Sequence, residues 1–344
     1  MDLSSWPWWL FVAGAGLGWF LTGVLRRYAL ARNVLDVPNA RSSHQQPTPR
    51  GGGLAFVIGF LLGLVALWLS GGVATDVACA LGGAGAWIAL VGFLDDHGHI
   101  QARWRLLAHF AAAAWILAWL GGAPPLAVGS ATFQLGAVGS VLAALYLVWL
   151  LNLYNFMDGI DGIASVEAIC ATVGAAVLYV LVGQPGLLGT SLLLGATVAG
   201  FLVWNFPPAR IFMGDGGSGF LGIVLGGLSL QAGWDAPALL WGWLILLGVF
   251  VVDATTTLLR RLLRGEKVYE AHRTHAYQYA ARRWKSHKVV TLSVLVINIF
   301  WLLPWAMLVA VEWLPGWLGA LVAYAPLLAL ALSLGAGRAE STTV

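Results

Sequence analysis

The chain has 344 residues, of which 60% are hydrophobic and only 10% are charged. Soluble domains carry about 25% charged residues, so this composition excludes a soluble globule, a disordered chain and a disulfide-stabilised secreted module. The apolar residues fall in runs of roughly 17–25, the length that crosses about 30 Å of hydrocarbon as a helix. The sequence therefore predicts an all-α polytopic integral membrane protein that forms one domain over residues 1–344.

Eleven apolar runs are candidate transmembrane helices. The first lacks a basic start and a small-residue cleavage site, so we expect a retained span rather than a signal peptide. The expected spans are 6–25, 51–69, 74–94, 106–122, 134–151, 165–183, 187–205, 218–233, 236–259, 289–311 and 314–334.

The basic residues divide unevenly between the two sides of these spans. If the connecting segments alternate between the sides, all eighteen Lys and Arg residues fall on one side. Because basic loops stay in the cytoplasm, this division predicts an N-terminus outside the cell and a C-terminus in the cytoplasm.

Five carboxylates lie at span ends on the basic side, namely Asp95, Asp96, Asp158, Asp161 and Asp215. Carboxylates near hydrocarbon are costly unless they bind something. The adjacent Asp95 and Asp96 repel each other, which favours a cation site or a general base. A solvated helix end is the alternative interpretation.

A polar stripe precedes Gly162. Asn152, Asn155, Asp158 and Asp161 recur at intervals of three residues, which places them on one face if the segment is helical. The neighbouring glycines let a ligand approach the backbone closely. Polar contact between two helices is the alternative interpretation.

The segment 212–218 combines a carboxylate, two glycines and a hydroxyl at the expected start of a helix. Asp215 suits Mg²⁺, which prefers oxygen ligands. The backbone N–H groups before Ser218 suit a phosphate. Taken alone, the segment also fits an ordinary glycine-rich turn.

Cations that could hold phosphate groups lie in loops of the same side. They are His44, Arg50, Arg103, Arg105, His272, Arg273 and His275. For the last three, a juxtamembrane segment that binds anionic membrane lipid is the alternative.

Carboxylates for Mg²⁺, cations for a diphosphate and the lack of a soluble domain together favour phosphoryl transfer onto a lipid phosphate. Two anions approach each other only if a metal ion and several cations offset their charge. The chain has neither a phosphate-binding Walker loop nor a dinucleotide fingerprint, and we expect no nucleic-acid partner.

The order and spacing of these motifs resemble the polyprenyl-phosphate N-acetylhexosamine-1-phosphate transferase family, from about Asp36 to Gln278. The matching motifs are Asn-x-x-Asn-x-x-Asp-Gly-x-Asp-Gly at 152–162, Asn-x-x-Pro-Ala-x-Ile-Phe-Met-Gly-Asp-x-Gly-Ser at 205–218, and the pair Asp95 and Asp96. The resemblance implies transfer of an N-acetylated sugar 1-phosphate from a UDP-sugar to undecaprenyl phosphate, with release of UMP. It also implies Mg²⁺, with Mn²⁺ as a substitute, and a site on the cytoplasmic face of the bacterial inner membrane.

The resemblance also implies roles for individual residues. Asp215 looks like the family's metal ligand, and Phe212 like the aromatic residue that contacts uracil. Asp158, Asp161 and Asn205 match residues that line the nucleotide pocket.

Asp95 and Asp96 match the pair that the family links to the lipid phosphate and the metal. We favour direct attack by the lipid phosphate, with Asp95 as an orienting group. Asp253 also matches a family position, although a role in helix packing fits it equally.

The chain departs from the family in its last large loop. Where many members carry a His-x-His-His run, this sequence has His272, Arg273, Thr274 and His275, followed by Ala-Tyr-Gln. With the run at 47–53, this pattern looks closest to the subgroup that initiates O-antigen or other surface polysaccharides. N-acetylfucosamine, N-acetylquinovosamine and N-acetylglucosamine stay open as the sugar, and a homodimer stays open as the assembly.

Two other classes of function compete with this prediction. A lipid or ion transporter, or a flippase, would carry ionisable residues near mid-span and an internal repeat. Here only Asp253 and Glu167 come close to mid-span. A membrane scaffold would need no ordered set of Asp and Asn residues.

Overall fold

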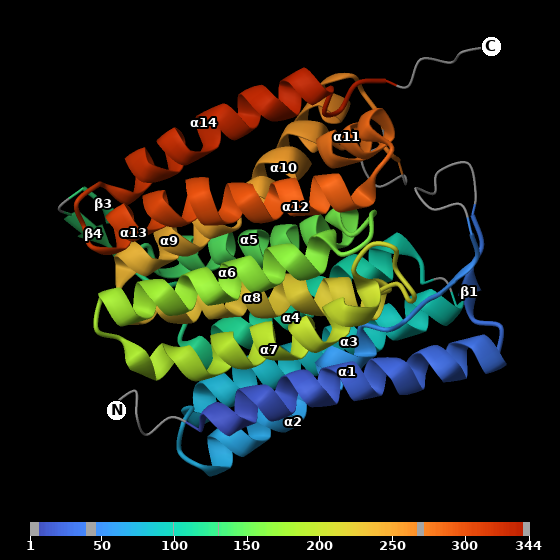
Figure 1. The fold of residues 1–344 in the computed structure, drawn as a ribbon. Coiled ribbons are helices and arrows are strands. Elements are labelled where there is room, and N and C mark those ends of the chain that lie inside the picture. The colour runs from blue at the N-terminus through green and yellow to red at the C-terminus, as the bar shows by residue number, and fades with distance from the viewer. Residues whose placement is uncertain (1–6, 39–45, 99, 130, 267–271, 340–344) are drawn as a thin grey trace.

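The computed structural model of the chain describes residues 7–38, 46–98, 100–129, 131–266 and 272–339. Long helices form one bundle, and short strands lie at its two ends (Figure 1). The first elements are α1 (Trp8–Ala31), β1 (Leu35–Asp36), β2 (Thr48–Pro49), α2 (Leu54–Leu69), α3 (Thr75–Gly98), α4 (Ala102–Leu120), β3 (Leu126–Val128) and β4 (Ala131–Phe133).

The two pairs of strands are antiparallel, β1 with β2 and β3 with β4. The middle of the chain contains α5 (Gly136–Met157), α6 (Ile163–Leu181), the 3-10 helix η2 (Pro185–Leu187), α7 (Leu188–Asn205) and α8 (Asp215–Asp235). The last elements are α9 (Pro237–Leu246), α10 (Gly248–Leu263), α11 (Ala276–Trp284), α12 (His287–Ile297), the π-helix η3 (Asn298–Leu302), α13 (Leu303–Ala310) and α14 (Gly316–Leu334).

The number of membrane-length helices is smaller than the sequence predicts. Within the described residues, seven helical segments are long and apolar enough to cross a membrane, or eight if the bent pair α9 and α10 counts as one span. They are Trp8–Ala31, Thr75–Gly98, Gly136–Met157, Ile163–Leu181, Pro185–Asn205, His287–Ala310 and Gly316–Leu334. The prediction of eleven spans is therefore wrong, although each expected run lies on a helix or on consecutive helices.

Three of the expected spans fall short for physical reasons. The 16 residues of α2 extend only about 24 Å, less than the hydrocarbon thickness. Helix α4 begins with Arg103 and Arg105 in its first turn, and α8 is rich in glycine and serine. An apolar run in a sequence is therefore a weaker criterion than a helix of membrane length and hydropathy.

Helix α8 forms the centre of the bundle and is buried along nearly its whole length. It packs against α3 and α5. A Cβ atom on Gly222 would lie 2.5 Å from the Leu151 Cα atom of α5. Small residues therefore let α8 approach its neighbours at backbone distance, which is the usual way in which membrane helices pack.

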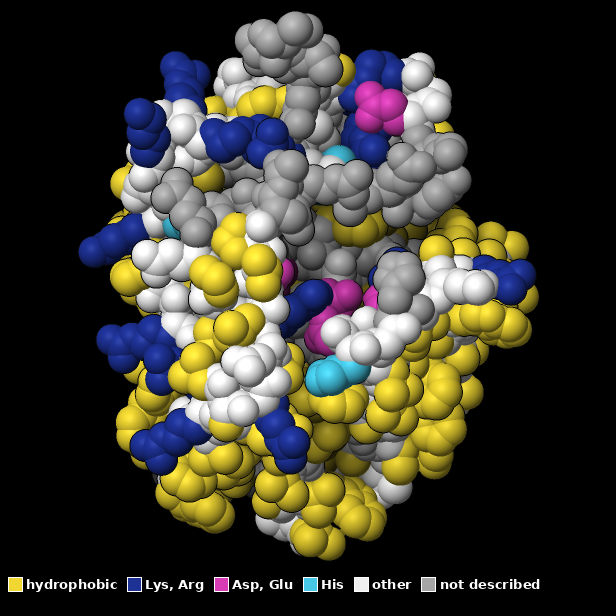
Figure 2. Space-filling model, turned by 90° about the vertical axis from the view of Figure 1, so that its right-hand side faces the viewer, with side chains coloured by type: hydrophobic (Ala, Val, Ile, Leu, Met, Phe, Trp, Pro, Cys, Tyr) yellow, Lys and Arg dark blue, Asp and Glu magenta, His cyan; other side chains and the backbone are white. Residues whose placement is uncertain are grey.

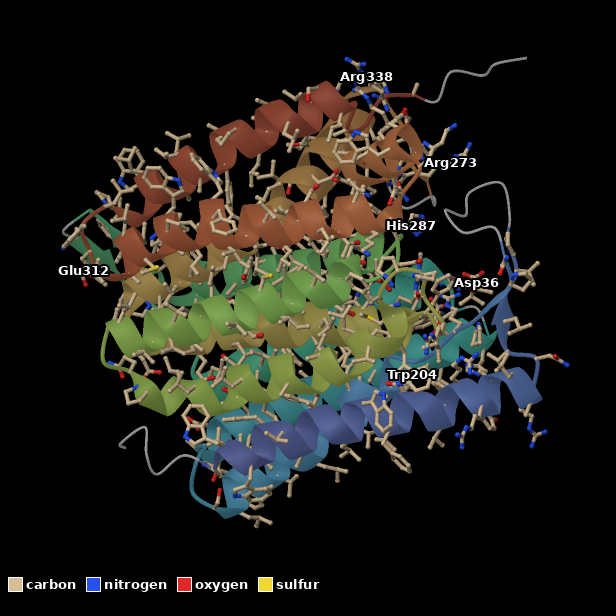
Figure 3. All side chains as sticks on the ribbon, viewed as in Figure 1. Asp36, Trp204, Arg273, His287, Glu312 and Arg338 are labelled. Carbon is tan, nitrogen blue, oxygen red and sulfur yellow. The ribbon has the colours of Figure 1, made fainter. Side chains whose placement is uncertain are left out.

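The ends of the bundle differ in charge. Figure 3 shows Asp36, Arg273, His287 and Arg338 at one end and Glu312 at the other. Helix α1 begins at the end that carries Glu312, and α14 finishes at the charged end (Figure 1). The labelled arginines thus lie at the end opposite Glu312, as the sequence predicts, whereas the full separation of the basic loops and the side of the membrane on which each end lies stay predictions.

Candidate active site

The glycine-rich run after Pro47 is joined to the loop before α8 by backbone hydrogen bonds. Gly52 donates to the Phe212 carbonyl and Gly53 to the Met213 carbonyl, both at 2.9 Å, and Phe212 donates to the Pro49 carbonyl at 2.8 Å. Two segments about 160 residues apart in the chain therefore form one platform at the charged end of the bundle.

Arg50 binds two carboxylates on this platform. Its Nη2 atom lies 2.8 Å from Asp96 Oδ1 and 2.7 Å from Asp215 Oδ1. Asp215 begins α8, and its backbone N–H donates to Asp96 Oδ2 at 3.0 Å. Burial acts to lower the pKa of Arg50, but Asp215, Asp96 and Asp36 outweigh it and raise that pKa. The guanidinium is therefore a permanent cation between two acids.

The neighbouring Asp95 faces away from this cluster. Its Oδ2 atom pairs with Arg105, and its Oδ1 atom accepts from the backbone N–H of Ile100 at 2.6 Å. Asp95 and Asp215 both line a cavity of about 50 Å³, the small cavity, together with Arg105, His109, Asn152, Asn155 and Phe156. The two adjacent carboxylates thus face different surroundings.

Only the first half of the predicted polar stripe, Asn152 and Asn155, lines the small cavity. Helix α5 ends at Met157, so Asp158 and Asp161 do not continue its face. Asn155 donates to Ser218 Oγ at 3.2 Å, and Asn152 lies 3.3 Å from His109 Nδ1. Asp158 follows the end of α5, where burial, and then the charge of Asp215, raise its pKa well above the usual value. Around Asp158 there are therefore more carboxylates than cations.

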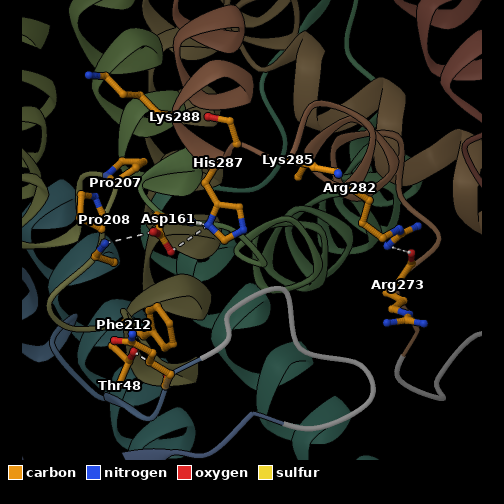
Figure 4. A pocket seen from close by; sticks show the side chains of 14 residues that line it. Thr48, Asp161, Pro207, Pro208, Phe212, Arg273, Arg282, Lys285, His287 and Lys288 are labelled. Carbon is orange, nitrogen blue, oxygen red and sulfur yellow. Dashed lines mark hydrogen bonds and ion pairs between the residues drawn. The ribbon is translucent and has the colours of Figure 1, made fainter.

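A much larger cavity, of about 1000 Å³, opens beside the platform (Figure 4). Phe212, Thr48 and the two prolines of the 205–218 motif form part of its wall. Five basic side chains also line it, namely Arg273, Arg282, Lys285, His287 and Lys288. An aromatic ring together with several cations suits a nucleoside diphosphate.

Asp161 is the acidic residue that lines the large cavity. Its Oδ2 atom accepts from the Ala209 backbone N–H at 3.0 Å, and its Oδ1 atom lies 3.2 Å from His287 Nδ1. Asn205, in contrast, is buried and binds the chain itself: it accepts from the Gly162 N–H and donates to the Ile211 carbonyl. Asn205 lines neither cavity and instead fixes the two loops that do.

The two predicted histidines of the last loop lie together. The rings of His272 and His275 stack at 4.8 Å, and each ring lies 6.5 Å from the ring of Phe156. Burial, and then the neighbouring His275, lower the pKa of His272 to about 3. This shift favours the neutral imidazole in the arrangement seen here, and the predicted contact of His272 with a phosphate stays a prediction.

Asp253 holds this loop in place. Its carboxylate accepts from the backbone N–H groups of Ala276 and Tyr277 at 2.9 Å and lies 3.3 Å from His275 Nδ1. These groups form the start of α11, so Asp253 of α10 caps another helix. Tyr277 in turn donates to the Phe156 carbonyl at 3.0 Å.

Some predicted residues lie elsewhere, and some residues were missed. Arg103 is exposed and stacks over Trp104. His44 lies outside the described residues. Sequence reasoning counted Arg282, Lys285 and Lys288 only as loop charges and did not consider His287. The one sequence feature that points to these four residues is the cluster of basic residues on either side of Trp284.

The carboxylates around Arg50 are candidate ligands of a divalent cation. Among the described residues, no group of three or more His, Cys, Asp or Glu side chains converges as a metal site. Asp96, Asp158 and Asp215 nevertheless interact electrostatically around one cation, Arg50. Their hard oxygen donors and excess negative charge fit Mg²⁺.

Seen from the charged end, the bundle presents acidic side chains in a central hollow, with Lys and Arg around it (Figure 2). Membrane-length helices and this cluster of charged residues at one end define an integral membrane protein with a charged candidate site.

Comparisons with known proteins identify the family. Residues 78–233 match the model of glycosyl transferase family 4. The probable undecaprenyl-phosphate N-acetylglucosaminyl 1-phosphate transferase of Bacillus subtilis is 29% identical, with 81% of this chain and 77% of that protein covered. The decaprenyl-phosphate N-acetylglucosaminephosphotransferase of Mycobacterium tuberculosis is 30% identical, with 82% of this chain and 78% of that protein covered. The phospho-N-acetylmuramoyl-pentapeptide-transferase of a Synechococcus species is 32% identical, with 69% of this chain and 70% of that protein covered.

The chain therefore belongs to glycosyl transferase family 4, the polyprenyl-phosphate N-acetylhexosamine-1-phosphate transferases.

Proposed function

We propose that this enzyme transfers N-acetylglucosamine 1-phosphate, or a closely related N-acetylhexosamine 1-phosphate, from a UDP-sugar to undecaprenyl phosphate. The printed names of two relatives, from Bacillus subtilis and Mycobacterium tuberculosis, include N-acetylglucosamine and a polyprenyl phosphate. These names favour N-acetylglucosamine over the two 6-deoxy sugars that the sequence also leaves open.

The loop before α8 is the observation that carries the proposal. Phe212 of this loop lines the large cavity, and Asp215, three residues later, lines the small one. One rigid segment therefore contacts both spaces at the position where the two substrates have to meet. The large cavity suits the nucleotide donor, and the small cavity suits the phosphate of the lipid.

The chemistry requires little proton transfer. An oxygen atom of the lipid phosphate attacks the β-phosphorus of the UDP-sugar, and the bond from that phosphorus to the bridging oxygen breaks, so that UMP leaves with the bond's electrons. Because the second pKa of a phosphate monoester is about 6, the acceptor is already a dianion at neutral pH. Arg105 and Asp95 would orient it, and positioning supplies most of the acceleration.

We further propose that Asp215 and Asp96 hold Mg²⁺, for which Mn²⁺ can substitute, with Asp158 nearby. When bound, the cation would offset the charge that builds up on the diphosphate as the bond breaks. Arg50 supplies a fixed positive charge at the same place.

The site would face the cytoplasm, where UDP-sugars are made, and the lipid-linked product would initiate O-antigen or another surface polysaccharide. This assignment rests on the separation of basic loops and on the 47–53 and 272–278 segments.

The test is to incubate purified protein with undecaprenyl phosphate, Mg²⁺ and a panel of UDP-sugars while UMP is measured. We expect UMP from at least one UDP-N-acetylhexosamine, and only when the lipid phosphate is present. Folded protein that releases no UMP from any sugar of the panel would refute the proposal.

A further inference from the structure

One buried carboxylate has no part in the chemistry proposed above. Glu167 lies in α6 one turn after the 152–162 motif, and its side chain is completely inaccessible to solvent. A carboxylate inside a membrane bundle is costly and is usually retained for a function.

Glu167 is held by two groups from other parts of the chain. Asn298 donates its Nδ2 hydrogen to Glu167 Oε2 at 2.7 Å. The backbone N–H of Phe250, in the first turn of α10, also interacts electrostatically with the carboxylate. Asn298 begins the π-helix η3, a local widening of a helix that is frequent at functional sites.

Phe250 lies at the point where α9 and α10 part. The sequence predicts one continuous span over 236–259, but the two helices are bent by 70° across Leu247. A break of this kind leaves the first N–H groups of α10 without partners in their own helix. Leu247 supplies no side-chain cap, so a carboxylate from α6 takes that role, as the positive end of a helix favours.

The bend determines where Asp253 lies. Asp253 follows Phe250 by less than one turn of α10, and it caps α11 through Ala276 and Tyr277. Tyr277 then donates to the carbonyl of Phe156, which lines the small cavity. A series of polar contacts and one short helical segment therefore joins Glu167 to the wall of the proposed acceptor site.

The cluster around Glu167 is not fully satisfied by the described residues. Both amide hydrogens of Asn298 are used, on Glu167 and on the Val294 carbonyl. Glu167 Oε1 and Asn298 Oδ1 are buried acceptors with no donor, and the nearby Tyr154 hydroxyl is likewise unpartnered. Buried polar atoms of this kind ordinarily bind an internal water molecule.

We propose that Glu167 is a positioning residue: together with Asn298 it fixes the bend between α9 and α10, and through Asp253 and α11 it holds the wall of the acceptor cavity. The inference rests on the transferase function proposed above. It assigns Glu167 a role through hydrogen bonding rather than through its charge, and it places the effect on the lipid side of the reaction, because the chain of contacts ends at the small cavity.

The test compares Glu167→Gln with Glu167→Leu. Gln keeps an oxygen that can accept from Asn298 and face the Phe250 N–H, whereas Leu has none. We expect the kcat of Glu167→Gln to stay within about threefold of the unmutated enzyme and that of Glu167→Leu to fall at least about tenfold, because small misplacements near a reacting centre are costly. The affinity for UMP, measured separately by calorimetry, should not change in either variant.

Thr172→Val is the matched control. Thr172 is a buried polar residue of the same helix, but among the described residues its hydroxyl donates to Ala168 and Ile169 of α6 itself and to no other helix. Its kcat should stay near that of the unmutated enzyme. Unchanged kcat in Glu167→Leu, or an equal loss in Glu167→Gln and Glu167→Leu, would overturn the inference.

A second variant and a second readout cover the case in which Glu167→Leu does not fold. Asn298→Ala removes the donor to Glu167 and should lower kcat in the same way, again with UMP affinity unchanged; full kcat would contradict the proposal. Spin labels on the exposed Leu263 of α10 and Val12 of α1, in a chain without its two cysteines, report the bend directly.

The distance distribution between the labels should broaden in Glu167→Leu and not in Glu167→Gln; identical distributions in all three proteins would refute the role. This readout does not depend on activity. The unmutated enzyme tests the transferase function by UMP release alone, so failure of that function and failure of this inference are distinguishable.

Discussion

Arg50 and its two acids show how a single cation can organise a site that has an excess of negative charge. The Asp96 side chain is only 6% exposed, while those of Arg50 and Asp215 are 35% and 27% exposed. Asp96 thus anchors the guanidinium from beneath, and Asp215 lies nearer to the cavity. Removing the Asp215 carboxylate would leave Asp96 bound to Arg50 and would take away the acid that faces the small cavity.

Asp215→Asn tests this division of roles. We expect kcat to fall roughly hundredfold or more, since a group that stabilises transition-state charge is lost, with little change in thermal stability. Asp235→Asn makes the same substitution at the other end of α8 and should keep near-normal activity. Activity of Asp215→Asn close to that of the unmutated enzyme would remove Asp215 from the proposed metal site.

His272 predicts a dependence of stability on pH. Its pKa in the folded protein is lowered to about 3, mainly by burial, below the value of about 6.5 in an unfolded chain. Between these values the unfolded chain binds the extra proton and the folded protein does not, so acidification destabilises the fold as pH falls through about 6.5 towards 3.

Melting temperatures measured between pH 7.5 and pH 5 check this expectation. The decrease at low pH should be smaller in His272→Gln than in the unmutated protein. His97→Gln, at an exposed histidine of α3, should follow the unmutated protein. An identical decrease in all three proteins would contradict the burial of a neutral imidazole.

The residue types of the site were predictable from the sequence, but several of their contacts were not. Motif spacing predicted that Phe212, Asp215 and Asp161 lie at one site, and the structure places them on connected loops. The pairing of Asp161 with His287, 126 residues later, has no local signal in the sequence. Asn205 is of a residue type that often binds ligands. Its hydrogen bonds in the structure show that it binds the chain's own backbone.

At the scale of elements, the contact of α3 with α8 sets the position of the reacting groups. A Cβ atom on Gly92 would lie 2.5 Å from both the carbonyl carbon of Asp215 and the N atom of Gly216. Neither atom belongs to a side chain that could move aside. The two helices therefore meet backbone to backbone where α8 begins, a contact that only glycine permits.

Gly92→Ala tests this contact. The added methyl group should push α8 away from α3, with a loss of stability of about 1–3 kcal/mol, as for overpacking elsewhere, and a fall in kcat of at least about tenfold. Gly98→Ala is the control on the same helix, because a Cβ added there meets nothing within 4 Å. It should change neither the stability nor kcat. Full activity and stability of Gly92→Ala would show that α8 can shift without harm.

The helices themselves were more predictable than their interruptions. In the described residues every expected run lies mostly on a helix or on consecutive helices, because runs of about twenty apolar residues have few other stable forms in a membrane. The bend at Leu247 was missed because the residues on both sides of it are apolar, and the groups that stabilise the break come from α6 and η3. The short helix α11 was missed because it is polar and its cap is Asp253, on another helix.

At the scale of the whole molecule, the basic residues and the carboxylates of the candidate site gather at one end of the bundle, and both proposed substrate cavities open there. This arrangement suits an enzyme whose nucleotide substrate is soluble and whose acceptor is dissolved in the membrane. The donor can enter from water without crossing hydrocarbon, while the lipid needs to present only its phosphate.

The predicted orientation can be tested with single cysteines in a chain whose own two cysteines are replaced. Glu312→Cys should react with a membrane-impermeant maleimide in intact cells, and Arg338→Cys should react only after the membrane is made permeable. The opposite pattern would reverse the orientation, and equal labelling of the two positions in intact cells would contradict the separation of the ends.

The fate of the β-phosphate tests the central claim most directly. UDP-N-acetylglucosamine labelled with phosphorus-32 in its β-phosphate is incubated with the purified enzyme, Mg²⁺ and undecaprenyl phosphate, and the organic and aqueous phases are separated. Transfer of the sugar 1-phosphate predicts that the label enters the lipid in amounts equal to the UMP released. Label that stays in the aqueous phase as UDP, while the sugar alone reaches the lipid, would contradict the account.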